Sequence, residues 1–331
     1  MAKDRPDRRA VIDIGTNTVN LLVCDVDVDA GSYTVVEDVS EVTRLGDGME
    51  RGGPMQQAAI DRTCATIRRY VVRARRLGAV ETAGVGTSVL RAAANTPTFL
   101  ELVRTGFQLD VDVIPSAAEA RLSYLSVRLD DAFPGGRSDH LIVTDVGSGS
   151  TEFVFGRFVP GQRQLDTYLS VNVGGVRLTS RFLASDPPTD AEMSELSEWL
   201  DETLATQLAI PSFGESLPLV VGVGGTIVNL AAVKVGKSHD DHEALHGQIL
   251  SADEIEEQIR LFRASATGDR ARVPGLAPRR ADIIVAGAAI VQAILRRLGV
   301  ANIYVSTRGL RYGVMYDRFV AEDADRGSEA S

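Results

Sequence analysis

Residues Asp145–Thr151 read DVGSGST, a stretch in which two glycines alternate with hydroxyl residues between the carboxylates of Asp145 and Glu152. The five residues before it, HLIVT, have the composition of a buried strand, and the residues after it, EFVFG, alternate as a second strand would. A glycine-rich stretch between two such strands predicts a tight hairpin turn. One turn of this kind indicates no ligand by itself.

The same pattern occurs a second time near the N-terminus. IDIGTNTVNLLV (residues 12–23) aligns with TDVGSGSTEFVF (residues 144–155), which places Asp13 on Asp145, Gly15 on Gly147 and Thr18 on Ser150. Internal similarity at this spacing indicates two related domains rather than a solenoid. The length of 331 residues suits about two domains, and two equivalent turns could face each other across a cleft.

The composition narrows the class of protein. A hydrophobic content of 44% with 24% charged residues is ordinary for a soluble globular protein. Cys24 and Cys64 lie in apolar patterns, which favours buried thiols in a reducing compartment. Neither a secretory signal nor an apolar run of the ~18 residues that a membrane span needs is found, so we expect a cytoplasmic protein without a membrane partner. The net charge of −10 argues against a nucleic-acid partner.

Strand and helix patterns alternate along the chain, which predicts an α/β fold. One helix is expected to end at Gly78, a second to begin with Thr96 as N-cap and Pro97 as first residue, and a third to open with the capping box Ser251–Glu254. The last segment, NIYVSTRGLRYGVMYDRF, predicts a strand followed by a helix. Residues 321–331, AEDADRGSEAS, have the composition of a disordered acidic tail.

The two turns have the chemistry of a phosphate site. Glycine-rich turns expose backbone N–H groups that cradle anions, and Asp13 and Asp145 are oxygen ligands of the kind that Mg²⁺ prefers. The alternative is that both turns are ordinary hairpins that bind no ligand. Because the same pattern with an aspartate occurs twice, this alternative is the weaker interpretation. The predicted phosphate-binding residues of the turns are Gly15, Thr16, Asn17 and Thr18, and Gly147, Ser148, Gly149, Ser150 and Thr151.

Two further charged residues are candidates for the reaction. Arg91 precedes Asn95 by four residues on a short predicted helix, and arginine forks onto phosphate oxygens, although a surface arginine would give the same pattern. Glu119 falls in the first turn of a predicted helix, where a carboxylate also compensates the helix dipole. From spacing alone, function and dipole compensation are equally good explanations of Glu119.

Two other motifs are given structural or minor roles. HEALH, residues 242–246, matches the H-E-x-x-H pattern of zinc proteases, but it lies in a short polar stretch rather than on the long helix that such a site requires. The arginines of residues 68–76 form a basic helix face, for which solvation is the first explanation and substrate guidance the second.

These motifs together resemble the exopolyphosphatase and guanosine-pentaphosphate phosphatase (Ppx/GppA) family. DIGTNTVNLLV, GTSVLRAAAN, IPSAAEARL and DVGSGSTEFV are similar to family segments in the same order, and so are VGGVRLT, GVGGT, LHG, PGLAPRRADII and VSTRGLRYG. The resemblance extends from about Val11 to Tyr316, which is nearly the whole chain.

The resemblance implies two actin-like (ribonuclease H-like) domains around a central cleft. The expected domains are residues 1–123, with a helix at 307–320 packing back on them, and residues 124–306. The expected reaction is hydrolysis of a terminal phosphoanhydride, in which Glu119 is the catalytic base, Arg91 holds phosphate, and Asn95, Gly224 and Gly225 bind substrate. Asp145 and Glu152, with Asp13 nearby, are implied to bind Mg²⁺, or Mn²⁺ in its place.

The resemblance leaves the substrate open between polyphosphate and guanosine pentaphosphate, and a homodimer is common in the family. Longer members carry extra helical domains that help hold long polyphosphate, so here we expect short chains to be favoured. The alternatives are an actin-fold ATPase or kinase, and a non-catalytic regulator that binds guanosine alarmones. Ser148 and Tyr312 depart from the usual Gly and Glu, and Ser148 narrows the approach to the backbone of the second turn.

Overall fold

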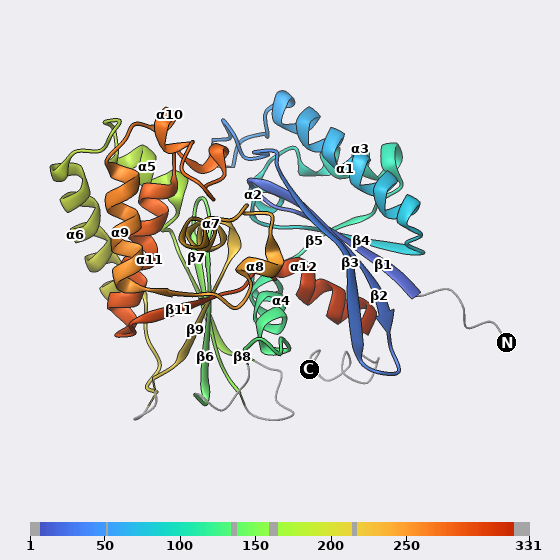
Figure 1. The fold of residues 1–331 in the computed structure, drawn as a ribbon. Helices are drawn as coiled ribbons and strands as arrows, with labels where there is room; N and C mark the ends of the chain where they lie inside the picture. The colour runs from blue at the N-terminus through green and yellow to red at the C-terminus, as the bar shows by residue number, and fades with distance from the viewer. Residues whose placement is uncertain (1–6, 51, 134–137, 159–164, 214–216, 321–331) are drawn as a thin grey trace. The chain divides into compact units, whose positions relative to one another are not determined.

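A computed structural model describes residues 7–50, 52–133, 138–158, 165–213 and 217–320 (Figure 1). The chain forms two compact units. The first contains the residues up to Ser126 together with those from Leu310 onward, and the second contains Val127–Gly309. The chain therefore passes between the units twice, at 126/127 and 309/310, where the sequence predicts boundaries at 123/124 and 306/307. The predicted acidic tail lies outside the described residues.

The first unit is built on a five-stranded sheet. β1 pairs antiparallel with β2 and parallel with β4, β2 pairs antiparallel with β3, and β4 pairs parallel with β5. The order across the sheet is β3 (Ser32–Val42), β2 (Thr18–Asp27), β1 (Asp7–Ile14), β4 (Glu81–Gly86) and β5 (Val111–Val113).

The second unit repeats this arrangement and adds one strand at its edge. β6 pairs antiparallel with β7 and parallel with β9, as β1 does with β2 and β4. The order is β10 (Ile249–Ser251), β11 (Asn302–Val305), β9 (Leu219–Val223), β6 (His140–Val146), β7 (Thr151–Arg157) and β8 (Leu165–Val171). The internal repeat predicted from the two turns is thus confirmed at the level of sheet topology.

Helices cover the sheets and supply the cores. In the first unit they are α1 (Gln57–Leu77), α2 (Ser88–Ala92), α3 (Thr96–Phe107), α4 (Ser116–Arg128, whose last two residues belong to the second unit), α12 (Leu310–Met315) and a π-helical turn, η2 (Tyr316–Val320). In the second they are α5 (Gly175–Phe182), α6 (Asp190–Gln207), α7 (Gly224–Val235), α8 (His242–Leu245), α9 (Ala252–Arg263), α10 (Thr267–Arg270), η1 (Pro278–Arg280) and α11 (Ile284–Leu298).

The helix ends test three of the predictions. α1 ends at Leu77 with Gly78 in the left-handed conformation, as expected. Ser251 and Glu254 form the predicted capping box of α9. The start of α3 was wrong by one residue: the N-cap is Asn95, because the Thr96 hydroxyl instead donates to the backbone oxygen of Leu90.

Alternation along β1 and β6 divides the two faces of each sheet. Ile12 and Ile14 enter the core beneath α1, which leaves Asp13 on the opposite face. Ile142 and Val146 likewise enter the core of the second unit, which leaves Asp145 on the opposite face. Cys24 and Cys64 are both buried, and neither forms a disulfide with another described residue. No helix of the described residues is long and apolar enough to cross a membrane.

Candidate phosphate-binding and catalytic site

The predicted site residues follow the carboxyl ends of parallel strands in both sheets. In the first unit, β1 leads into the first turn, β4 into α2 with Arg91, and β5 into α4 with Glu119. In the second unit, β6 leads into the second turn and β9 into Gly224 and Gly225. In open α/β sheets this edge is where ligands bind, because the loops that follow the strands converge there.

The two turns have the same backbone geometry. The N–H of Gly15 donates to the oxygen of Thr18 at 2.9 Å, and the N–H of Gly147 donates to the oxygen of Ser150 at 3.0 Å. A Cβ at either glycine would press against the oxygen that closes the turn, at 3.1 Å and 2.9 Å. The alignment of Gly15 with Gly147 therefore reflects one steric requirement met twice.

The first turn is supported from the segment that follows β3. The N–H groups of Thr43 and Arg44 both donate to the oxygen of Asn17, and that of Gly46 donates to the oxygen of Thr16. The hydroxyls of Thr16 and Ser88 lie 2.8 Å apart. This contact joins the first turn to the start of α2, which carries Arg91.

The second turn is supported from the start of α5. The N–H groups of Val176 and Arg177 donate to the oxygen of Ser148, and the Arg177 side chain donates to the oxygen of Gly149 at 2.8 Å. A Cβ on Gly174 would meet the backbone of Ser148 at 2.5 Å. The contacts at Gly147 and Gly174, both of which require glycine, thus hold this turn.

The carboxylates beside the turns differ between the units. Asp145 lies directly opposite Glu152 in the β6–β7 register, whereas Asp13 lies opposite Asn20 in β1–β2. Asn20 donates to Asp13 Oδ2 at 2.8 Å, while a pair of carboxylates at opposed positions repel each other unless a cation joins them. Glu152 accepts hydrogen bonds from Ser150 and Ser170, at 2.7 Å and 2.9 Å. Asp145 and Glu152 therefore suit a divalent cation better than Asp13 does.

Asp13 is the most deeply buried of the predicted ligands. It is 7% exposed, and its Oδ1 has no hydrogen-bond partner among the described residues. Burial raises the pKa of the Asp13 carboxyl, while the hydrogen bond from Asn20 and the charge of Arg311 oppose that rise. A carboxylate in this setting has a spare acceptor atom and gains from a nearby cation.

Arg91 and Glu119 lie in direct contact. The Arg91 Nη1 donates to Glu119 Oε2 at 2.8 Å and to the backbone oxygen of Ile114, also at 2.8 Å. Both side chains are about one quarter exposed, at 27% and 25%, so both remain reachable from solvent. The structure thus brings together the predicted phosphate-binding arginine and the predicted base.

Asn95 has a structural partner instead. Its amide accepts from the N–H of Met55 at 2.9 Å and donates to the oxygen of the same residue at 3.0 Å. Both ends of the side-chain amide are occupied by one backbone position, so its predicted binding to substrate stays a prediction.

Gly224 and Gly225, at the start of α7, each lie against a charged side chain. Gly224 has φ of +85°, and a Cβ there would collide with the Asp145 carboxylate. A Cβ on Gly225 would collide with the guanidinium of Arg280. The two glycines therefore bring Asp145, Arg280 and the N–H groups of a helix start to one place.

A comparison with known sequences places this geometry in a family. The profile of the Ppx/GppA phosphatase family matches residues 26–322. The chain belongs to this family. Exopolyphosphatase 2 of Mycobacterium tuberculosis is 31% identical over 319 residues, covering 93% of this chain and 97% of that one. Exopolyphosphatase 1 of Mycobacterium leprae is 28% identical, covering 95% and 90%.

Solved structures of the Ppx/GppA family share the fold. The Ppx/GppA enzyme of Aquifex aeolicus has a TM-score of 0.79 at 30% identity, covering 95% of this chain and all of that one. An exopolyphosphatase from Cytophaga hutchinsonii has a TM-score of 0.78 at 26% identity, covering 93% and 96%. The predicted actin-like α/β fold is confirmed.

In this Ppx/GppA chain, Arg280, which lies against Gly225, is a charged residue that sequence reasoning did not single out. Its neighbourhood is held by two buried side chains. Asn229 links the oxygen of Gly225 to the N–H of Ala277, and Arg270 donates to the oxygen of Ala281 at 2.8 Å. An asparagine inside the apolar helix GGTIVNLAAV was a signal that could have pointed to this loop.

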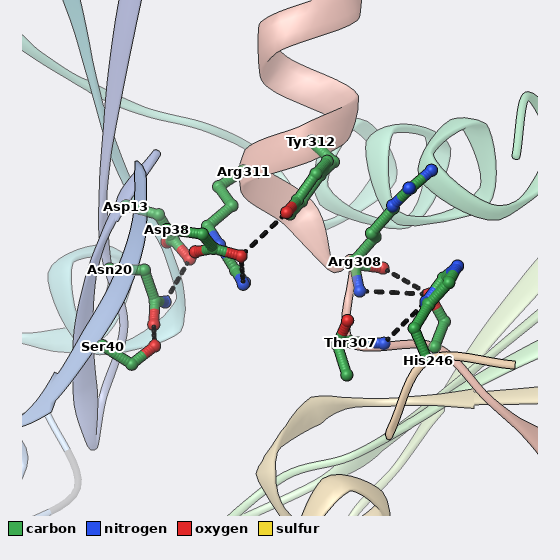
Figure 2. Close-up of polar contacts among 10 residues, drawn as sticks. Asp13, Asn20, Asp38, Ser40, His246, Thr307, Arg308, Arg311 and Tyr312 are labelled. Atoms are coloured by element: carbon green, nitrogen blue, oxygen red, sulfur yellow. Dashed lines mark hydrogen bonds and ion pairs between the residues drawn. The ribbon is translucent and has the colours of Figure 1, made fainter. Parts of the chain in front are cut away.

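The HEALH motif has another role in the structure. α8 is four residues long, and His246 lies beyond its end. His246 Nε2 lies 3.0 Å from Asp130 Oδ2, and Arg308 lies 3.0 Å from Asp130 Oδ1. Figure 2 shows His246, Thr307 and Arg308 close together. Burial raises the pKa of the Asp130 carboxyl, but contact with His246 and Arg308 more than offsets burial and holds it below its usual value. His246 thus belongs to a buried polar cluster with a carboxylate.

Proposed function

We propose that this Ppx/GppA-family enzyme is an exopolyphosphatase, which releases the terminal phosphate of inorganic polyphosphate. The observation that carries the proposal is the duplicated glycine turn, each copy preceded by an aspartate at the carboxyl end of a buried strand. The names of the curated relatives, exopolyphosphatases 1 and 2, support the same activity.

The binding groups proposed for phosphate are, in the first unit, the turn at Gly15–Thr18 with Arg91 and, in the second unit, the turn at Gly147–Ser150 with Arg280. Backbone N–H groups and the hydroxyls of Thr16, Thr18 and Ser148 donate to phosphate oxygens, whereas the Ser150 hydroxyl already donates to Glu152. Arg91 and Arg280 add planar guanidinium groups, which form paired hydrogen bonds with phosphate. Phosphoryl transfer requires chiefly such positioning and neutralisation of charge.

In the second unit, the groups proposed to bind a metal are Asp145 and Glu152, and the fit rests on their opposed positions on β6 and β7. In the first unit, Asp13 is a separate candidate carboxylate because its Oδ1 has no partner among the described residues. No cluster of three or more His, Cys, Asp or Glu with metal-binding geometry occurs in the described ranges. Carboxylate oxygens suit Mg²⁺, which keeps several waters, and when bound it would neutralise charge on the phosphates.

Glu119 is the proposed general base. Its contact with Arg91 holds the carboxylate in one orientation. If Arg91 binds the terminal phosphate, it brings that phosphate close to the Glu119 carboxylate. The carboxylate would take a proton from the attacking water as its oxygen bonds to the terminal phosphorus and the bridging P–O bond breaks. The terminal phosphoryl group is then released as orthophosphate, and the shortened chain is the leaving group.

Short polyphosphates are the proposed preference. The net charge of −10 repels the distant part of a long polyanion, so only phosphates at the turns and arginines gain attraction. We expect the KM per chain end to change little as the polymer lengthens, at fixed Mg²⁺ and salt. A steep and continuing fall in KM toward very long chains would reveal a binding track and contradict this preference.

The activity itself is tested with Glu119→Gln on a short polyphosphate. The variant should bind substrate while its rate falls on the order of 10²–10⁴ below that of the unmodified protein. Glu101→Gln is a matched control, because Glu101 also pairs with an arginine but is exposed on α3. Equal rates for Glu119→Gln and the control would remove Glu119 from the mechanism.

A further inference from the structure

A buried ion pair lies at the start of α12. Arg311 donates from Nε and Nη2 to the two carboxylate oxygens of Asp38, at 2.7 Å and 2.6 Å. The hydroxyl of Tyr312 donates to Asp38 Oδ2 at 2.8 Å. The side chains of Arg311 and Asp38 are only 9% and 7% exposed. Figure 2 shows Arg311, Asp38 and Tyr312 beside Asp13.

Asp13 lies next to this pair without joining it. Its Oδ2 accepts from Asn20, which itself accepts from Ser40, and its Oδ1 is buried without a partner among the described residues. The charge of Arg311 acts on Asp13, yet no hydrogen bond or ion pair of the described residues joins the two.

An arginine near a buried carboxylate with a spare oxygen would ordinarily pair with it, because both groups lose hydration. Here the fork of Arg311 is already filled by Asp38. The backbone of α12 also packs closely against α4, since a Cβ on Gly313 would collide with the backbone oxygen of Leu122. Arg121 of α4 pairs with Asp317 of η2 at 2.8 Å, which fixes the turn that follows α12.

We propose that Asp38, with Tyr312, is a positioning residue that holds Arg311 off Asp13 and keeps the Asp13 carboxylate uncommitted to any cation of the protein. Asp13 then stays available to the cation that accompanies the phosphate substrate. This inference rests on the proposed role of Asp13. It gives a function to the buried Asp38–Arg311 ion pair, which takes no direct part in the proposed reaction.

The first test needs no catalysis. In the presence of a chelator, Asp13→Asn should raise the thermal midpoint of the unmodified protein, because it removes a buried and half-satisfied charge. In an Asp38→Asn background Arg311 would turn to Asp13, so the same Asp13→Asn change should lower the midpoint. The same sign in both backgrounds would overturn the proposal.

The second test uses phosphate release. Asp38→Asn should lower kcat at least tenfold. The double variant Asp38→Asn/Arg311→Met should recover most of that loss, because no guanidinium is left to form an ion pair with Asp13. A double variant as slow as the single one would overturn the proposal. Asp25→Asn is the matched control, because Asp25 forms a similar paired contact with Arg8 at the far end of β1.

Tyr312→Phe supplies a milder variant if Asp38→Asn does not fold. It should lower kcat about three- to tenfold and reduce the gain in midpoint from Asp13→Asn, and no change in either quantity would count against the proposal. Absence of phosphate release by the unmodified protein would contradict the proposed function alone. The thermal midpoints would still test whether Asp38 and Tyr312 hold Arg311 away from Asp13.

Discussion

Replacement of Gly224 by alanine is the perturbation that most directly probes the β9–α7 junction. Gly224 has φ of +85°, a conformation that costs a residue with a Cβ about 1–2 kcal/mol. The added methyl would also overlap Asp145 Oδ1 and lie 3.3 Å from Asp145 Cγ. The variant thus combines a general backbone cost with a displacement of one proposed metal ligand.

Gly236 separates these two effects. It lies just past the other end of the same helix with φ of +63°, and a Cβ there would meet nothing within 4 Å. Gly236→Ala therefore pays a similar backbone cost without moving any ligand. Both variants should lower the thermal midpoint by about 2–8 °C, since each kcal/mol shifts a domain of this size by roughly 2–4 °C.

The activities should differ sharply. To reach ordinary contact with the new methyl, the Asp145 carboxylate must move by about 1 Å, and a displacement of that size costs on the order of 10²-fold in rate. Initial rates of phosphate release from short polyphosphate, at saturating Mg²⁺, should fall about a hundredfold for Gly224→Ala and less than twofold for Gly236→Ala. Equal rates for the two variants would refute the placement of Asp145 in the reaction.

Three further predictions concern the metal and two carboxylates. Activity should vanish with a chelator and return with Mg²⁺ or Mn²⁺ but not with Zn²⁺, because the proposed ligands are oxygens; restoration by Zn²⁺ alone contradicts the oxygen site. Glu152→Gln should raise the Mg²⁺ concentration for half-maximal rate at least tenfold, since it removes one anionic ligand, and an unchanged requirement would exclude Glu152. Asp130→Asn should lower the free energy of unfolding by about 1–3 kcal/mol at neutral pH, because it removes the charged partner of the partly buried His246. Because the pKa of Asp130 is held below its ordinary 3.8, its contribution is complete above that value and lost as pH falls below it; the midpoints of variant and unmodified protein should therefore converge only below about pH 4, and convergence already at pH 6 would contradict the cluster.

The fold could be predicted because its signal is local and occurs twice. Each turn needs a glycine where a Cβ would press on the oxygen that closes the turn, as at Gly15 and Gly147. The capping box at Ser251 and the glycine stop at Gly78 depend likewise on residues close in sequence. Such requirements are visible without any knowledge of tertiary contacts.

The residues that sequence reasoning missed depend on contacts distant along the chain. Arg280 is brought to Gly225 by a loop that Asn229 and Arg270 hold from elements up to 48 residues away. Asp38 lies 273 residues from Arg311, so no local pattern marks it. The one-residue error at the start of α3 has the same origin, because Asn95 and Thr96 take partners at Met55 and Leu90.

Phosphate release from three substrates compared side by side tests the proposed exopolyphosphatase activity most directly: short-chain polyphosphate, guanosine pentaphosphate and ATP, each at equal terminal-phosphate concentration with Mg²⁺. We expect the highest kcat/KM for polyphosphate, slower release from guanosine pentaphosphate, and the slowest from ATP, with all three rates falling together in Glu119→Gln. Preferential hydrolysis of ATP, or binding of all three without turnover, would contradict the proposed activity.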